Sequence, residues 1–145
     1  MKQVLRGLWV GLAVVALILV RYQQDVLFYD PLRFFFEGLY LNAQELPVIN
    51  SLKLLLNVSL RYWLNSALSI VILVLLFRSS EIYKLALLIY ASAFMILILL
   101  FTVLILNYSA GMSMLLFYVR RFLIQPVFIL ILVPAFYYQR LRSSK

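Results

Sequence analysis

Four long apolar segments, separated by shorter polar stretches, organise the chain. They run over residues 5–21, 54–77, 85–106 and 114–138. Each approaches or exceeds the roughly 20 residues with which a helix crosses a ~30 Å hydrocarbon core. The pattern predicts an all-α fold, an integral membrane four-helix bundle in which residues 1–145 form a single transmembrane domain.

The first segment is the shortest of the four. Its uninterrupted apolar run covers residues 7–20, and Arg6 and Arg21 flank it. These arginines extend its usable length, because their side chains can reach from the apolar core to the interface. A signal peptide is the competing interpretation, since the stretch has a basic start and a short core. No small-x-small cleavage site follows that core, so we expect an uncleaved anchor.

Composition supports lipid as the solvent of these segments. Hydrophobic residues make up 66% of the chain, against about 45–50% apolar residues in an ordinary soluble domain. The chain has no cysteine and no histidine, which excludes thiolate nucleophiles, disulfides, Cys/His metal sites and imidazole bases. We therefore expect neither a metal nor another cofactor.

The charges are distributed unevenly among the polar stretches. Residues 2–6, 78–84 and 139–145 hold seven basic residues and one acid, whereas the loop 22–50 holds four of the five acids. Because lysine and arginine gather in cytoplasmic loops, we expect both termini in the cytoplasm and the loop 22–50 outside. We assign the net charge of +8 to cytoplasmic anchoring and to contact with the bilayer, including anionic lipid, and expect no nucleic-acid partner.

The outer loop contains an unusually aromatic stretch, residues 28–40. Aromatic side chains favour the headgroup level of a bilayer. Asp30 followed by Pro31 is typical of a helix start, with the aspartate as N-cap and the proline at the first helical position. The pattern predicts a short interfacial helix over residues 31–37, lying on the outer face. Its apolar side would alternatively pack across the mouth of the bundle.

The second apolar segment carries a polar face. Asn57, Arg61, Asn65 and Ser69 recur every four residues and so follow one side of a helix. In lipid, such a face is expected to contact other helices rather than acyl chains. Interhelical hydrogen bonding and a binding groove or partner surface are both compatible with it.

Three arginines are predicted to share one depth near the outer boundary. Arg61, Arg120 and Arg121 each lie roughly 24–27 Å above the cytoplasmic end of their segment, at about 1.5 Å per residue. We call these three residues the arginine layer. Arg120 and Arg121 point about 100° apart on a helix, so they are expected to contact different groups. Gln125 shares the face of Arg121, one turn deeper.

Three interpretations of the arginine layer stay open at this point. The first is internal ion pairing with Asp30 or Glu37, which would fasten the outer loop to the bundle. The second is an anionic head group, phosphate or lipid-linked substrate held by arginine forks. The third is a carboxylate or carbonyl group supplied by a partner protein. A charge inside hydrocarbon is costly, which is why each interpretation gives the arginines an anion or acceptor.

The last segment contains two prolines. Pro126 and Pro134 are predicted to bend the segment, and Pro126 leaves the carbonyl of Phe122 without its helical donor.

Catalysis is not expected anywhere in the chain. No acid lies well inside a span, and Lys53 and Lys84 lie at span ends. We therefore expect neither a carboxylate pair nor a Ser–Lys dyad, and we assign no catalytic residue.

Three motifs resemble a known family. FYVRRFLIQPVFILILVPAFYYQ at residues 117–139, FYDPL at 28–32 and RYWLNSALS at 61–69 are similar to the exosortase F system-associated proteins of flavobacteria and their relatives. The resemblance covers nearly the whole chain in the same order. It implies a small multi-pass protein of the bacterial inner membrane, encoded beside an exosortase. The exosortase is the enzyme that processes proteins with a C-terminal sorting signal.

The resemblance transfers a setting but no functional residues. It implies an exosortase as partner, with the catalytic cysteine, arginine and histidine on that enzyme. We therefore expect a noncatalytic membrane partner that stabilises the exosortase or presents the substrate tail at the outer leaflet. The alternative is a binding protein for a lipid or lipid-linked saccharide that uses the arginine layer. Candidate partner- or anion-binding residues are Arg61, Asn65, Arg120, Arg121 and Gln125, and candidate ion-pair acids are Asp30 and Glu37.

Overall fold

The computed structural model describes residues 2–38 and 40–143, and every regular element in this part of the chain is a helix. Lys145 of the basic tail and the side chain of Lys2, both counted in the charge pattern, lie outside what is described. The elements are α1 (Lys2–Tyr22), α2 (Gln24–Leu27), α3 (Leu32–Glu37), the 3-10 helix η1 (Tyr40–Asn42), α4 (Ser51–Phe77), α5 (Ser80–Leu106), α6 (Ser113–Ile124) and α7 (Val127–Ser143). The predicted all-α class is confirmed.

Three of these helices are long and apolar enough to cross a membrane, namely α1, α4 and α5. A fourth crossing exists if α6 and α7 are taken together. The prediction of one helix over residues 114–138 is wrong, because the axes of α6 and α7 differ by 63°. The described residues thus form seven α-helices rather than four long ones and a short one.

The chain bends where Pro126 was expected to bend it. Gln125 has an extended conformation, with φ −110° and ψ 142°, as is usual before proline. Pro126 has no N–H to donate to the carbonyl of Phe122, so α6 ends at Ile124. Pro134, in contrast, lies inside α7.

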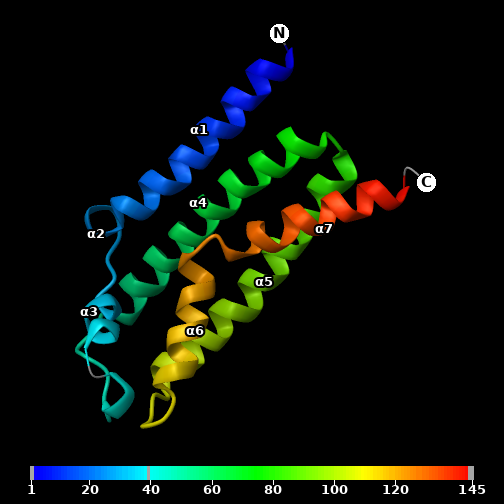
Figure 1. Cartoon of the computed structure of the whole chain (residues 1–145). Coiled ribbons are helices and arrows are strands. Elements are labelled where there is room, and N and C mark those ends of the chain that lie inside the picture. Colours follow the sequence, from blue (N-terminus) through cyan, green and yellow to red (C-terminus); the bar gives the residue numbers. More distant parts are fainter. Residues whose placement is uncertain (1, 39, 144–145) are drawn as a thin grey trace.

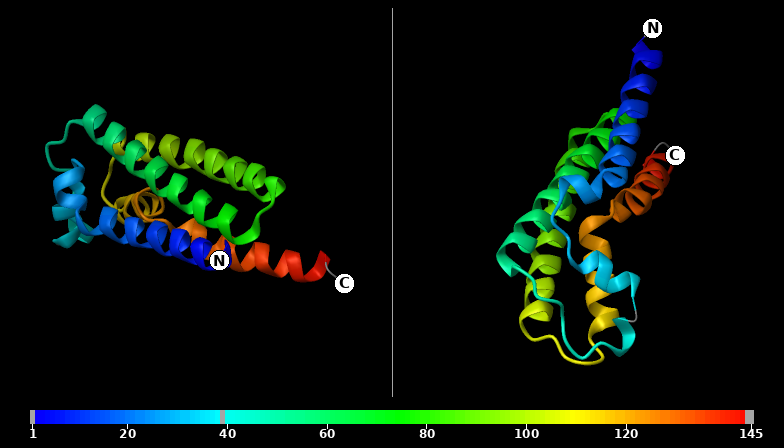
Figure 2. Two further views of the ribbon diagram at one scale, coloured as in Figure 1. Left: turned by 90° about the horizontal axis from the view of Figure 1, so that it is seen from above. Right: turned by 90° about the vertical axis from the view of Figure 1, so that its left-hand side faces the viewer.

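Helix α4 occupies the centre of the molecule and contacts α1, α5, α6 and α7. Figures 1 and 2 show both chain ends toward one end of the bundle, and α3, η1 and the α5–α6 connection toward the other. The tight α4–α5 turn has local causes. Arg78 adopts the left-handed conformation at the end of α4, and the Ser79 hydroxyl accepts the N–H of Ile82 at 3.5 Å.

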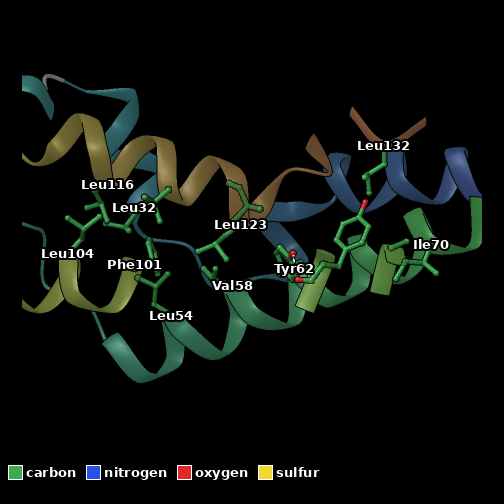
Figure 3. Close-up of a cluster of buried hydrophobic side chains, with 14 of the residues drawn as sticks. Leu32, Leu54, Val58, Tyr62, Ile70, Phe101, Leu104, Leu116, Leu123 and Leu132 are labelled. Atoms are coloured by element: carbon green, nitrogen blue, oxygen red, sulfur yellow. Dashed lines mark hydrogen bonds between the residues drawn. The ribbon is translucent and has the colours of Figure 1, made fainter. Parts of the chain in front are cut away.

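The short outer helix α3 packs into the core. Leu32 is fully buried and Phe36 is 9% exposed. Leu32 lies among Leu54, Phe101 and Leu116, from α4, α5 and α6 (Figure 3). Of the two placements considered for residues 31–37, packing across the bundle is therefore the one observed.

The start of α3 differs from the prediction by one residue. The helix begins at Leu32, Pro31 takes the N-cap position, and no side chain caps the helix. The prediction of Asp30 as N-cap is wrong. The backbone carbonyl of Asp30 accepts the N–H of Arg33 at 3.2 Å, but the Asp30 carboxylate binds the side chain of Arg120 on α6.

Candidate functional site

Asp30 and Arg120 form the centre of a polar cluster inside the bundle. Arg120, in the last turn but one of α6, donates from Nε to Asp30 Oδ1 at 3.2 Å and from Nη2 to Oδ2 at 2.5 Å. Arg120 is 8% exposed, and its guanidinium lies 5.5 Å from the ring centre of Phe36. Two parallel charge-assisted bonds define a strong, directional pair. The pair joins the segment before α3 to α6.

Arg61 reaches the same carboxylate from α4 but is less completely bonded. Its Nη1 lies 3.9 Å from Asp30 Oδ2, and its Nη2 donates to Gln24 Oε1. Its Nε is buried without a hydrogen-bond partner. The residue is 4% exposed, and the ring of Phe28 lies 5.6 Å from its guanidinium carbon. Arg61 thus has one neutral hydrogen-bond acceptor, Gln24, and lies near the Asp30 carboxylate that Arg120 binds.

Asp25 and Glu37 bind a different arginine. Arg33 pairs with Asp25 and, through Nε, with Glu37 Oε1 at 2.9 Å. Both acids are more than half exposed. Glu37 therefore makes an internal ion pair with a residue four positions earlier on α3, and not with Arg61 or Arg120.

The arginine layer divides into two parts in the structure. Arg61 and Arg120 converge on Asp30, whereas Arg121 is exposed. The Nε of Arg121 donates to Gln125 Oε1 at 3.2 Å, one turn along the same face. As expected for neighbouring helical residues, which point about 100° apart, Arg120 and Arg121 have different partners.

Asn65 stabilises the break between α6 and α7. Its Nδ2 donates to the carbonyl of Ile124 at 3.1 Å in a buried position. That carbonyl ends α6 and has lost its helical donor because the chain turns at Pro126. Interhelical hydrogen bonding, one of the two roles considered for the polar face of α4, is therefore confirmed for Asn65. Tyr62 makes a second such bond, from its hydroxyl to the carbonyl of Tyr90 at 2.7 Å.

A groove of about 700 Å³ begins at this cluster and runs between α1 and α7, with α4 as its floor. Arginine and glutamine side chains line one end, and aliphatic side chains line the rest. The polar lining is Arg21, Gln24, Arg33, Arg61, Asn65, Arg120 and Gln125. Aliphatic walls come from Val14 and Leu17 of α1, Ile72 of α4, and Ile129, Leu130 and Val133 of α7. The bend at Pro126 creates this space by directing α7 away from the axis of α6.

Two contributors to the site were missed in the sequence. Gln24 gives Arg61 its hydrogen-bond acceptor from 37 residues away, and Phe28 covers the same guanidinium. Gln24 lies just beyond the first apolar segment, where a polar residue is ordinary. The only signal in the sequence was the position of Gln24 at the outer end of the first apolar segment, which is also the depth predicted for Arg61.

The groups of the cluster are suited to binding an oxyanion. Its groups are guanidiniums, amides and a carboxylate already bound to arginine. Within the described residues, no group of three or more acidic side chains lies together as a metal site requires. A guanidinium fork binds oxyanions with two oxygens in fixed geometry. The aliphatic walls would accept an apolar chain attached to such an anion.

Compared with protein-family models, with curated proteins and with solved structures, the chain matches none of them. Its function is therefore inferred from the geometry of the site and from the sequence motifs.

Proposed function

We propose that the chain is an integral membrane protein with four crossings, formed by α1, α4, α5 and the bent pair α6–α7, and with both termini in the cytoplasm. The length and apolar character of the helices support this arrangement. Large aliphatic side chains remain exposed along the helices, for example Leu12, Ile96 and Leu99 at about 60%. Exposed apolar surface on this scale is expected against lipid and not against water. The basic residues at the end shared by the termini support the orientation.

Within that setting, we propose that the protein is a noncatalytic binding protein for a lipid or a lipid-linked saccharide with an anionic head group. The observation that carries this proposal is the groove between α1 and α7. Its cationic end lies at the level of Arg61 and Arg120, and its aliphatic walls extend from there toward the opposite end of the bundle. Such a lining complements a molecule with an anionic head and an apolar tail.

The dimensions of the groove suit an acyl or prenyl chain. Val10 and Arg21, which both line it, are roughly 17 Å apart along α1. Its volume of about 700 Å³ lies within the range of about 300–1,000 Å³ that is usual for small-molecule sites. The groove can therefore hold a flexible hydrocarbon chain that lies along α1.

Filling the groove tests this function. Val14→Trp would place an indole in the groove, whereas the indole of Leu12→Trp on the same helix would lie outside it. We expect wild-type protein and Leu12→Trp to retain a defined lipid through purification in mild detergent, and Val14→Trp to lose it, as measured by native mass spectrometry. Equal lipid retention by both variants, or no retained lipid in the wild-type protein, would reject the proposal.

A second candidate is a noncatalytic partner of an exosortase in the bacterial inner membrane. The observation that favours it is Arg121, which is exposed at the outer level of α6 and bonds to Gln125 instead of to an acid of the outer segment. An exposed arginine at that depth would meet a carboxylate or carbonyl of a partner or of a substrate tail. Arg121→Gln is then expected to reduce recovery of the exosortase in a pull-down while leaving bound lipid unchanged. Unchanged recovery at normal protein level would remove this candidate.

A further inference from the structure

The two buried arginines at the polar end of the groove have different surroundings. Arg120 uses two of its donors on Asp30, at 3.2 Å and 2.5 Å. Arg61 lies 3.9 Å from the same carboxylate, beyond hydrogen-bond distance, and among the described residues its bonded acceptor is the neutral amide of Gln24. Its Nε is buried without a partner. A guanidinium has five donors, and burying one with so few acceptors is unfavourable.

The charged side chains around the groove include one more positive charge than negative charges. Four arginines line it, namely Arg21, Arg33, Arg61 and Arg120. Three carboxylates bind this set: Asp30 pairs with Arg120 and lies near Arg61, and Asp25 and Glu37 pair with Arg33. Four positive and three negative charges leave one positive charge for a ligand to neutralise. A phosphomonoester, with a charge of about −1.5 to −2 at neutral pH, exceeds that excess.

We propose that Arg61 is the head-group ligand of the groove and that the head group is a singly charged oxyanion with two equivalent oxygens, as in a phosphodiester or a carboxylate. Arg120 is a positioning residue that holds Asp30 and the outer segment. This assignment rests on the proposed function, because it requires an apolar tail in the groove. Two equivalent oxygens match the Nε and Nη2 donors of one guanidinium edge.

Gln24 occupies the place of one ligand oxygen. Its Oε1 accepts from Arg61 Nη2, and it belongs to α2, a helix of four residues none of which is buried. Because Gln24 is only half-buried, its side chain has space to turn away from Arg61 when an anion binds. Gln24→Glu would convert this acceptor into an internal counterion with almost no change of shape, and would compete with an anionic head group.

The test compares lipids that share acyl chains and differ in their heads. Full-length protein in detergent is titrated with phosphatidylglycerol, with the matching fatty acid and with neutral diacylglycerol, and binding is read by native mass spectrometry. We expect Arg61→Gln to weaken binding of the charged lipids by about ten- to a hundredfold, the range of one hydrogen bond to a charged group. Binding of diacylglycerol should not change. Arg121→Gln is the matched control and should leave all three unchanged.

Gln24→Glu provides a test that leaves Arg61 in place. We expect it to remove the preference for charged lipids over diacylglycerol, and Gln24→Ala to increase that preference. The two charged lipids show which oxyanion is preferred. Wild-type binding of diacylglycerol as tight as that of both charged lipids would overturn the assignment, as would unchanged selectivity in both Arg61→Gln and Gln24→Glu. If Val14→Trp still abolishes binding, those outcomes leave lipid binding in the groove standing but remove Arg61 as the ligand of an anionic head group. Failure of all three lipids to bind the wild-type protein would reject both the assignment and the proposed function.

Discussion

Arg120 and Asp30 stand 90 residues apart in the chain and meet through two parallel hydrogen bonds, at 3.2 Å and 2.5 Å. Asp30 precedes α3, whose Leu32 and Phe36 are buried in the core. The ion pair and this apolar contact therefore hold the same short segment from two sides. Because the segment also brings Asp30 near Arg61, its attachment determines the charge balance at the polar end of the groove.

Breaking this pair is expected to destabilise the protein strongly. Arg120→Gln leaves the Asp30 carboxylate buried without its main partner, a change that typically costs about 3–5 kcal/mol. Asp30→Asn should have a comparable effect, and the double variant should lose less than the two single losses combined, since the pair acts as one unit. Chemical unfolding in detergent measures these differences.

Two further observations check that prediction. Trypsin should cleave the loop 22–50 of Arg120→Gln at Arg33 faster than that of the wild-type protein. Arg121→Gln, one residue away but exposed, should change stability by less than about 0.5 kcal/mol. Equal stabilities of the Arg120 and Arg121 variants would contradict a structural role for the pair.

Removal of the Asn65 amide should destabilise the junction of α6 and α7. Asn65→Leu has a similar size but leaves the buried Ile124 carbonyl without its donor, which corresponds to a loss of about 1–3 kcal/mol. Asn107→Leu removes an exposed bond to the carbonyl of Val103 and should have a much smaller effect. Thermal unfolding of the two variants in the same detergent is the measurement. A larger loss for Asn107→Leu would show that the junction does not depend on Asn65.

Pro126→Ala should straighten the last crossing and narrow the groove. Alanine supplies an N–H for the Phe122 carbonyl and removes the restriction on Gln125. The chain has no native cysteine, so spin labels are readily placed at Tyr118 and Tyr137, both exposed. From the 63° bend, full straightening would lengthen the distance between these positions along the helix axes by about 4 Å. Pro134→Ala, within α7, should leave it unchanged, and an unchanged distance in Pro126→Ala would mean that packing alone maintains the bend.

The topology is testable with single cysteines introduced at exposed positions. Gln44 lies in the loop 22–50, Ala110 in the α5–α6 connection, and Ser80 at the first position of α5, directly after the α4–α5 turn. We expect a membrane-impermeant thiol reagent to label positions 44 and 110 from outside, and position 80 only after permeabilisation, because basic residues gather at the cytoplasmic end. The reverse pattern would invert the orientation, and labelling of all three from outside would exclude four crossings.

Features with local causes could be predicted from the sequence. The apolar runs 54–77 and 85–106 end where α4 and α5 end, at Phe77 and Leu106, because helix formation there depends on residues within a few turns. The bend at Pro126 follows from the chemistry of one residue and its predecessor. The separation of Arg120 from Arg121 follows from helical geometry alone.

Features that join distant segments required the folded structure. Asp30 and Glu37 were equally plausible partners for the buried arginines by depth and charge. Burial of Leu32 and Phe36 places Asp30 beside α6 and leaves Glu37 exposed, one helical turn from Arg33. The packing of α3 against the core and the divergence of α7 from α6 together form the groove and bring Gln24 to Arg61. Side-chain packing among several helices selects one of many charge pairings of similar energy, and that selection is not encoded in the spacing of any single segment.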